Sequence, residues 1–127
     1  MSAVSSYKDL TVWQKSVACT VHVYEMTRKF PKEELYGITS QIQRAATSIP
    51  ANIAEGSTRG YLNQYINFLS VAYGSGAELE TFLVIAKRLG YITERDRAVV
   101  EVELNEVMRM LNSLIRILKG KRLVPKH

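Results

Sequence analysis

Cysteine is almost absent from this chain, and its scarcity is the first constraint on the fold. Cys19 is the only cysteine in 127 residues, so an internal disulfide is excluded. A lone thiol fits a protein that resides in a reducing compartment such as the cytoplasm. The first nine residues hold no apolar run, so we expect no secretory signal. The sequence therefore predicts a cytoplasmic protein that folds without covalent cross-links.

Residues that bind metals or perform catalysis are also scarce. The chain has two histidines, and only His22 falls in a predicted helix. A di-iron bundle needs two Glu-x-x-His pairs, and the sequence contains none. Cys19 lies three residues before His22, but it falls among apolar positions, and a nucleophilic pair needs a third, orienting group. We therefore expect no catalysis, no metal and no cofactor.

Acidic residues are missing from the C-terminal end of the chain. No aspartate or glutamate follows Glu106, whereas six basic residues do: Arg109, Arg116, Lys119, Lys121, Arg122 and Lys126. The segment 107–127 therefore carries a formal charge of +6, while the other 106 residues hold 11 basic and 12 acidic side chains. Because the basic surplus is concentrated at one end, the pattern favours a polyanionic partner.

Strand patterns are weak, and the few prolines and glycines divide the chain into long segments. We predict helices over about residues 10–30, 34–55, 61–89 and 94–118, followed by a basic tail over 119–127. Pro31 ends the first helix, Gly56 is expected to cap the second, and Gly90 follows the third. Thr93 and Asp96 have the spacing of a capping box at the start of the fourth. No long linker occurs, so residues 1–127 are predicted to form one domain.

Apolar residues recur in the predicted helices at alternating spacings of four and three. In the fourth helix this row consists of Val100, Leu104, Val107, Leu111, Leu114 and Leu118. Such rows let neighbouring helices pack at shallow crossing angles. Short loops between four such helices imply antiparallel neighbours. The sequence therefore predicts an all-α fold, an antiparallel up-down four-helix bundle.

The first predicted helix has more apolar surface than one bundle needs. One cluster, the Trp13 cluster, consists of Trp13, Val17, Val21 and Tyr24. A second, the Val12 cluster, lies about 140° away at 100° per residue and consists of Val12, Cys19, Val23, Met26 and Phe30. Either both sides touch neighbours within one compact bundle, or one side contacts another copy. We favour self-association, because exposed apolar patches of this kind mark interfaces, and we predict the Val12 cluster as the oligomer interface.

A line of polar residues interrupts the second predicted helix. Arg44, Ser48, Asn52 and Glu55 are spaced 4, 4 and 3 residues apart, and Pro50 lies among them. These groups either set helix register and subunit contacts or form a catalytic or binding line, and we favour the structural interpretation. Pro50 should kink the helix or free a backbone carbonyl.

The basic residues of the fourth helix also allow two interpretations. Arg109, Arg116 and Lys119 share a face roughly opposite the leucine row. The functional interpretation is contact with a phosphate backbone, independent of base sequence and sensitive to salt. The alternative is a solvated face whose terminal lysines complement the helix dipole. No aromatic residues interleave the stripe, so base stacking is not indicated.

Several motifs in the chain resemble those of a known family. Residues 48–56, SIPANIAEG, resemble the signature of the bacterial four-helix-bundle family first noticed in intervening sequences of 23S ribosomal RNA genes. Further matches lie at residues 10–15, 30–31, 72–80 and 89–92, and the resemblance spans about residues 7–120. The chain departs from the pattern at Gln43, where the family has a basic residue beside Arg44.

The resemblance implies a homopentamer of bundles arranged as a ring around a central channel. The chain is also similar to the accessory proteins of diversity-generating retroelements, which are barrel-shaped and basic and bind nucleic acid and a reverse transcriptase. We therefore expect a non-enzymatic ring that binds RNA or DNA, or a nucleic-acid-handling partner, through its C-terminal basic residues. The alternative is a purely structural or protein-interaction oligomer without a nucleic-acid role. No membrane association is expected.

Overall fold

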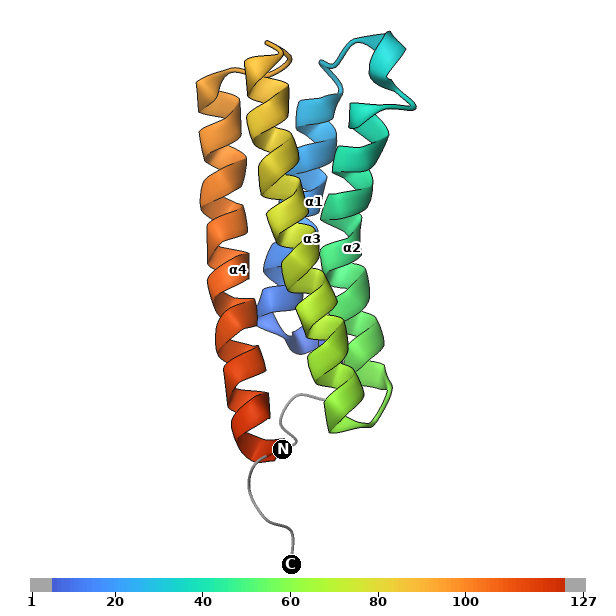
Figure 1. The fold of residues 1–127 in the computed structure, drawn as a ribbon, viewed down its shortest axis with the longest axis vertical. Coiled ribbons are helices and arrows are strands. Elements are labelled where there is room, and N and C mark those ends of the chain that lie inside the picture. Colours follow the sequence, from blue (N-terminus) through green and yellow to red (C-terminus); the bar gives the residue numbers. More distant parts are fainter. Residues whose placement is uncertain (1–5, 123–127) are drawn as a thin grey trace, which may run out of the picture.

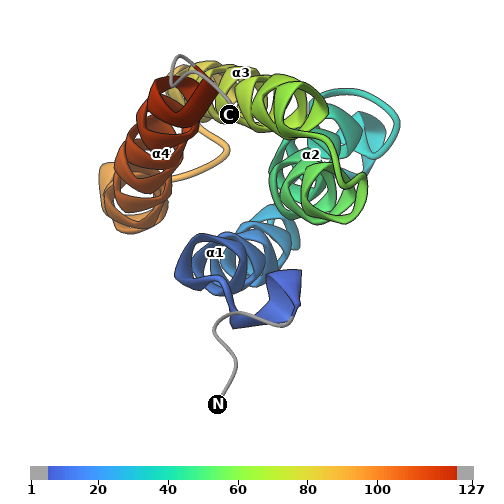
Figure 2. The same cartoon turned by 90° about the horizontal axis from the view of Figure 1, so that it is seen from below.

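Four long helices form the part of the chain that the computed structural model describes, residues 6–122. They are α1 (Thr11–Thr27), α2 (Ile38–Thr58), α3 (Leu62–Arg88) and α4 (Glu94–Arg122), with short 3-10 turns η1 (Tyr7–Asp9) and η2 (Lys32–Glu34). The helices alternate in direction, each packs beside the next, and α1 also contacts α4 (Figure 1 and Figure 2). Residues 6–122 contain no strand, so the prediction of an all-α fold with four helices is confirmed.

The core consists of one buried apolar row from each helix. The row of α4 follows the predicted spacing, with Leu114 only half-buried and its other members buried. Within the described residues, α3 is the one helix long and apolar enough to cross a membrane, by length and composition alone. Its apolar residues include a buried row that faces α2 and α4, and Leu69, Leu79 and Leu83 of that row are fully buried.

Gly56 does not cap α2 as the sequence predicts. It is buried inside the helix, and an added Cβ would lie 2.7 Å from the Cβ of Phe68 on α3. Glycine at this position allows the two helices to approach closely. The left-handed backbone conformation falls four residues later, at Gly60 with φ +82°, where the chain turns into α3.

Other helix ends differ from the predicted ones by a few residues. α1 stops at Thr27, because residues 28–30 form a turn ahead of Pro31, and α2 begins at Ile38, because residues 32–37 form η2 and a turn. α4 continues through Gly120 to Arg122, since one glycine in a helix costs only about 1 kcal/mol.

The capping box predicted at the start of α4 is present. The Asp96 N–H donates to Thr93 Oγ1 at 3.0 Å, and the Thr93 N–H donates to Asp96 Oδ2 at 3.3 Å. The two side chains thereby satisfy backbone donors that the first turn of a helix leaves free. The capping box therefore defines where α4 begins, directly after Thr93.

Pro50 frees a backbone carbonyl inside α2, and α1 supplies a partner for it. Proline has no N–H, so the carbonyl of Ala46, four residues earlier, loses its donor within the helix. The Thr20 hydroxyl of α1 lies 3.1 Å from this oxygen and 2.8 Å from the Ser16 oxygen. Because the hydroxyl carries one proton, the two carbonyls share it. This contact holds α1 at one position along the axis of α2.

Replacement of Thr20 by valine should lower the free energy of unfolding by about 1–2 kcal/mol, because the Ala46 carbonyl loses its donor. The loss should shrink in a Pro50→Ala background, where residue 50 again supplies an N–H. Urea unfolding of the wild type, both single variants and the double variant measures this coupling. An equal loss in both backgrounds would contradict the assignment.

Replacement of Gly56 by alanine should destabilise the bundle by about 1–3 kcal/mol, since the new methyl group overpacks against Phe68. Gly74→Ala is the matched control, because a Cβ at that helical position meets no atom within 4 Å. The control should gain up to about 1 kcal/mol from helix propensity. Thermal unfolding of both variants tests this; a neutral Gly56→Ala would show that α2 and α3 do not need the close approach.

Candidate nucleic-acid interface

The predicted basic residues lie in the C-terminal half of α4, at the lower end of the bundle in Figure 1. We call Arg109, Arg116, Lys119, Lys121 and Arg122 the basic end. All five side chains are exposed. The first three share one side of the helix, and the last two extend the positive surface around its final turn. The sixth predicted residue, Lys126, lies outside the described residues.

The start of α4 carries a cluster of ion pairs. Arg97 contacts both Glu94 and Glu101, and Lys87 Nζ of α3 lies 3.2 Å from Glu94 Oε1. Hydrogen bonds from Arg97, and then from Lys87, lower the pKa of Glu94 to about 2. Glu94 therefore stays ionised at neutral and mildly acidic pH. Its negative charge lies at the N-terminal end of the helix, where the helix dipole favours it.

Two further acidic residues of α4 contact side chains of α1. Lys15 Nζ lies 3.0 Å from Glu106 Oε1, and His22 Nδ1 lies 2.7 Å from Glu103 Oε2. Both pairs are partly exposed, so each contributes little to stability at physiological salt. They do, however, show the register of α1 against α4. With Asp96 in the capping box, every acidic residue of α4 has a partner.

The side chains of the basic end have no acidic partner among residues 6–122. Arg116 donates to the Ser113 hydroxyl at 3.4 Å, and the other four form no side-chain hydrogen bond or ion pair there. Charge is thus segregated along one helix. Acids lie between Glu94 and Glu106 and are paired, and the cations that follow face solvent. An exposed, uncompensated group of arginines and lysines is the surface that phosphates bind.

The predicted oligomer interface is wrong, because the Val12 cluster forms part of the core of a single chain. Each of its members is at most 8% exposed: Val12, Cys19, Val23, Met26 and Phe30. The Trp13 cluster faces outward instead. Val21 and Tyr24 are 53% and 41% exposed, and Trp13 and Val17 are half-buried.

The positions of α2 and α4 explain which cluster is buried. Thr20 and Thr27, which lie between the clusters, contact α2, while Lys15 and His22 contact α4. The Val12 cluster therefore lies between both neighbours. Periodicity cannot separate two arcs of similar apolar character. One signal could have done so: Trp and Tyr carry polar atoms that favour an outer position, and they occur only in the Trp13 cluster.

Cys19 is a packed thiol rather than a nucleophile. Burial, followed by repulsion from Glu103, raises its pKa to about 12. The thiolate, which is the reactive form, is therefore suppressed at neutral pH. His22 is bound to Glu103 instead of the thiol. These two residues do not form a nucleophilic pair.

The polar line of α2 divides into an inner and an outer part. Ser48 Oγ lies 2.8 Å from Ser75 Oγ of α3, and Asn52 Nδ2 donates to the Ser48 carbonyl at 2.7 Å and to its hydroxyl at 2.9 Å. Arg44 and Glu55 are exposed. Because the inner residues join α2 to α3, they support the structural interpretation. Sequence reasoning missed Ser75, whose role depends on the register between these helices.

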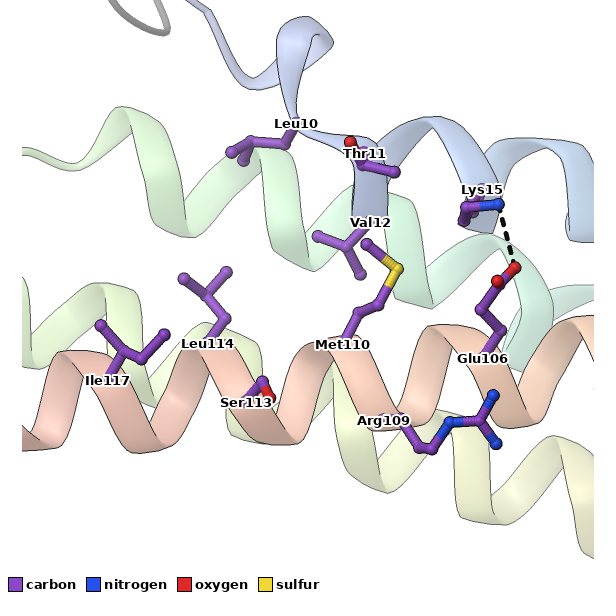
Figure 3. Close-up of a pocket in the computed structure, with 10 residues that line it drawn as sticks. All are labelled: Leu10, Thr11, Val12, Lys15, Glu106, Arg109, Met110, Ser113, Leu114 and Ile117. Carbon is purple, nitrogen blue, oxygen red and sulfur yellow. Dashed lines mark ion pairs between the residues drawn. The ribbon is translucent and has the colours of Figure 1, made fainter.

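A groove of about 610 Å³ runs between α1 and α4 beside the basic end (Figure 3). Its apolar walls come from the start of α1 and the second half of α4: Leu10, Val12, Met110, Leu114 and Ile117. The Lys15–Glu106 ion pair crosses one end, and Arg109 extends from the side of α4 turned away from α1 (Figure 3). Sequence analysis did not indicate this groove, because it depends on where α1 begins relative to α4.

The fold and the basic end together define a small four-helix-bundle protein with a candidate polyanion-binding surface. Comparison with protein families identifies it further. The model of the 23S rRNA-intervening sequence protein family matches residues 8–113, and the chain belongs to this family, as its motifs predicted. The match ends before Arg116, so four of the five residues of the basic end lie beyond it.

A solved structure supports the same assignment. The chain is similar to a protein of unknown function from the S23 ribosomal protein family of Bacteroides thetaiotaomicron, with 28% sequence identity and a TM-score of 0.74. The similarity covers 83% of this chain and 98% of that one. Comparison with curated proteins yielded no match. These findings establish the family and the fold, and function has to be argued from the surface.

Proposed function

We propose that this protein is a non-enzymatic, cytoplasmic bundle that binds RNA or DNA through the basic end of α4. The observation that carries the proposal is the segregation of charge along α4. Its acidic residues are all paired, and the five cations that follow have no acidic partner in the described chain. Lys126 would add a further charge to the same end. Such a surface contacts phosphates without reading base sequence.

The spacing of the charges fits a nucleic-acid backbone better than a single small anion. Thirteen residues separate Arg109 from Arg122, which is about 20 Å along a helix. A lone phosphate could contact only two or three of these side chains, whereas a polynucleotide presents many phosphates along that length. Release of condensed counterions would then drive binding. A nucleic-acid-handling protein such as a reverse transcriptase is the other partner that the family resemblance suggests for this surface.

We also propose that copies of the chain assemble into a ring, a homopentamer as the family resemblance implies. The Trp13 cluster, rather than the buried Val12 cluster, is then the contact surface on α1. It presents exposed Val21 and Tyr24 next to half-buried Trp13 and Val17, and no charged residue belongs to it. A ring would repeat the basic end around one rim. Multivalent binding would then exceed the affinity of a single chain.

Neutralising four residues of the basic end should weaken nucleic-acid binding. In the variant R109Q/R116Q/K119Q/K121Q, affinity for single-stranded RNA at low salt should fall at least about tenfold. The salt slope should lose about 0.7 per phosphate contact removed. The control is R28Q/K29Q/K32Q/R88Q, which changes net charge equally, with exposed residues at the opposite end of the bundle.

Fluorescence anisotropy of labelled RNA and DNA across a salt series measures both variants. At about 0.1 M salt the control should bind within about twofold of the wild type, since charge effects are then screened beyond a Debye length of about 10 Å. Absence of binding at low salt would refute the nucleic-acid proposal and favour the alternative, a purely structural or protein-interaction oligomer. Equal loss in both variants would show that net charge, rather than the basic end, determines affinity.

Charge placed in the Trp13 cluster should disrupt the assembly. Val21→Glu puts a carboxylate in the middle of this surface, so the mass in solution should fall toward that of a single 14.4 kDa chain. Lys29→Gln, in the turn that follows α1, changes net charge by the same amount and should keep the wild-type mass. Sedimentation at micromolar concentration measures this. A monomeric wild-type protein would refute the ring.

A further inference from the structure

α1 is much shorter than α4, and the bundle therefore has three helices instead of four at the basic end. α1 has 17 residues and α4 has 29, which correspond to about 26 Å and about 44 Å of helix. The Lys15–Glu106 pair shows their register, and Val12 lies opposite Met110 (Figure 3). The last turns of α4 continue past the start of α1 (Figure 1).

Within the described residues, the 3-10 turn that precedes α1 does not cover this part of α4. η1 packs against α1 and α2 and makes no contact with α4. The apolar side of α4 that faces α1 higher in the bundle is consequently open here. Ile117 is 56% exposed, and Met110 and Leu114 are half-buried. Together with Leu10, these side chains line the groove between α1 and α4.

Basic side chains lie at the edges of the groove, with Arg109 extending from the side of α4 turned away from α1 (Figure 3). Arg109 and Lys15 line it, and Lys121 lies one helical turn after Ile117 on the same side of α4. The only acidic residue in the lining, Glu106, is already paired with Lys15. An occupant should therefore have an apolar side for the walls and acidic groups for the rim, and a basic occupant would be repelled.

We propose that the groove binds an acidic amphipathic helix of a partner protein, which takes the place of the missing fourth helix. The groove extends from Glu106 to Ile117, about 17 Å or three helical turns. A helix of that length presents apolar residues at i, i+3, i+4 and i+7 to such a surface. Its acidic side would lie toward Arg109 and Lys121.

The openness of the groove favours a helix over a single lipid chain. Ile117 is more than half exposed, and the side chains of Lys15 and Glu106 are 43% and 48% exposed. A bound alkyl chain would leave one side in water, whereas an amphipathic helix buries its apolar side and keeps its polar side solvated. A second copy of this chain fits less well, because the outward-facing Trp13 cluster contains no acidic residue.

The test uses the full chain and a synthetic peptide of about 15 residues, with leucine at helical i, i+3, i+4 and i+7 positions and glutamate elsewhere. By fluorescence anisotropy the labelled peptide should bind saturably at micromolar concentration. Ile117→Glu should weaken binding at least about tenfold, since it places a like charge in the groove. Val102→Glu is the control, because Val102 is 70% exposed on α4 and does not line the groove.

Several results would overturn the proposal: no peptide binding by the wild type, equal loss in both variants, or equal binding of a peptide with lysine in place of glutamate. Displacement of the peptide by an equal concentration of dodecanoate would assign the groove to a lipid-like acid instead. Binding seen only after removal of residues 1–5 would show that this chain's own N-terminal segment occupies the groove. Ile117→Ser, which adds no charge beside Lys121, should also weaken peptide binding but keep the circular dichroism spectrum and the RNA affinity of the wild type, which separates this proposal from the nucleic-acid one.

Discussion

The register between α1 and its two neighbours determines which parts of this bundle remain uncovered. The Thr20 hydroxyl contacts the carbonyl that Pro50 frees and so holds α1 against α2, and the Lys15–Glu106 pair shows the register of α1 against α4. At this position along the bundle axis, the 17 residues of α1 do not extend to the last turns of α4. The groove follows from this mismatch in helix length, and it lies at the same end of the molecule as the basic end.

The basic end carries more positive charge than the dipole of α4 needs at its C-terminus. A helix C-terminus carries about half a negative charge, so one or two cations in the last turn stabilise it by about 0.3–1 kcal/mol each. Five cations that have no acidic partner among residues 6–122 lie on the second half of α4. Arg109 and Arg116 are also too far from the terminus to benefit. Capping of the dipole thus accounts for only part of the surplus, and the rest supports the proposed polyanionic partner.

Much of the fold could be predicted from local patterns, whereas the surfaces required the register. Alternating spacings in the fourth helix and the Thr93–Asp96 capping box depend only on neighbours along the chain, and both agree with the structure. The choice between the two clusters on α1 depends on where α2 and α4 lie. The role of Gly56 depends likewise on Phe68 of α3. Periodicity records which sides of a helix are apolar, but not which neighbour covers them.

The central claim is that the part of α4 beyond the reach of α1 is the functional surface. Chemical-shift mapping with ¹⁵N-labelled protein and single-stranded RNA at low salt tests it most directly. The account predicts that the shifted amides lie on α4 from Arg109 to Arg122, with α2 unperturbed around Arg44 and Glu55. Shifts confined to the polar line of α2, or no shifts at any site, would contradict it.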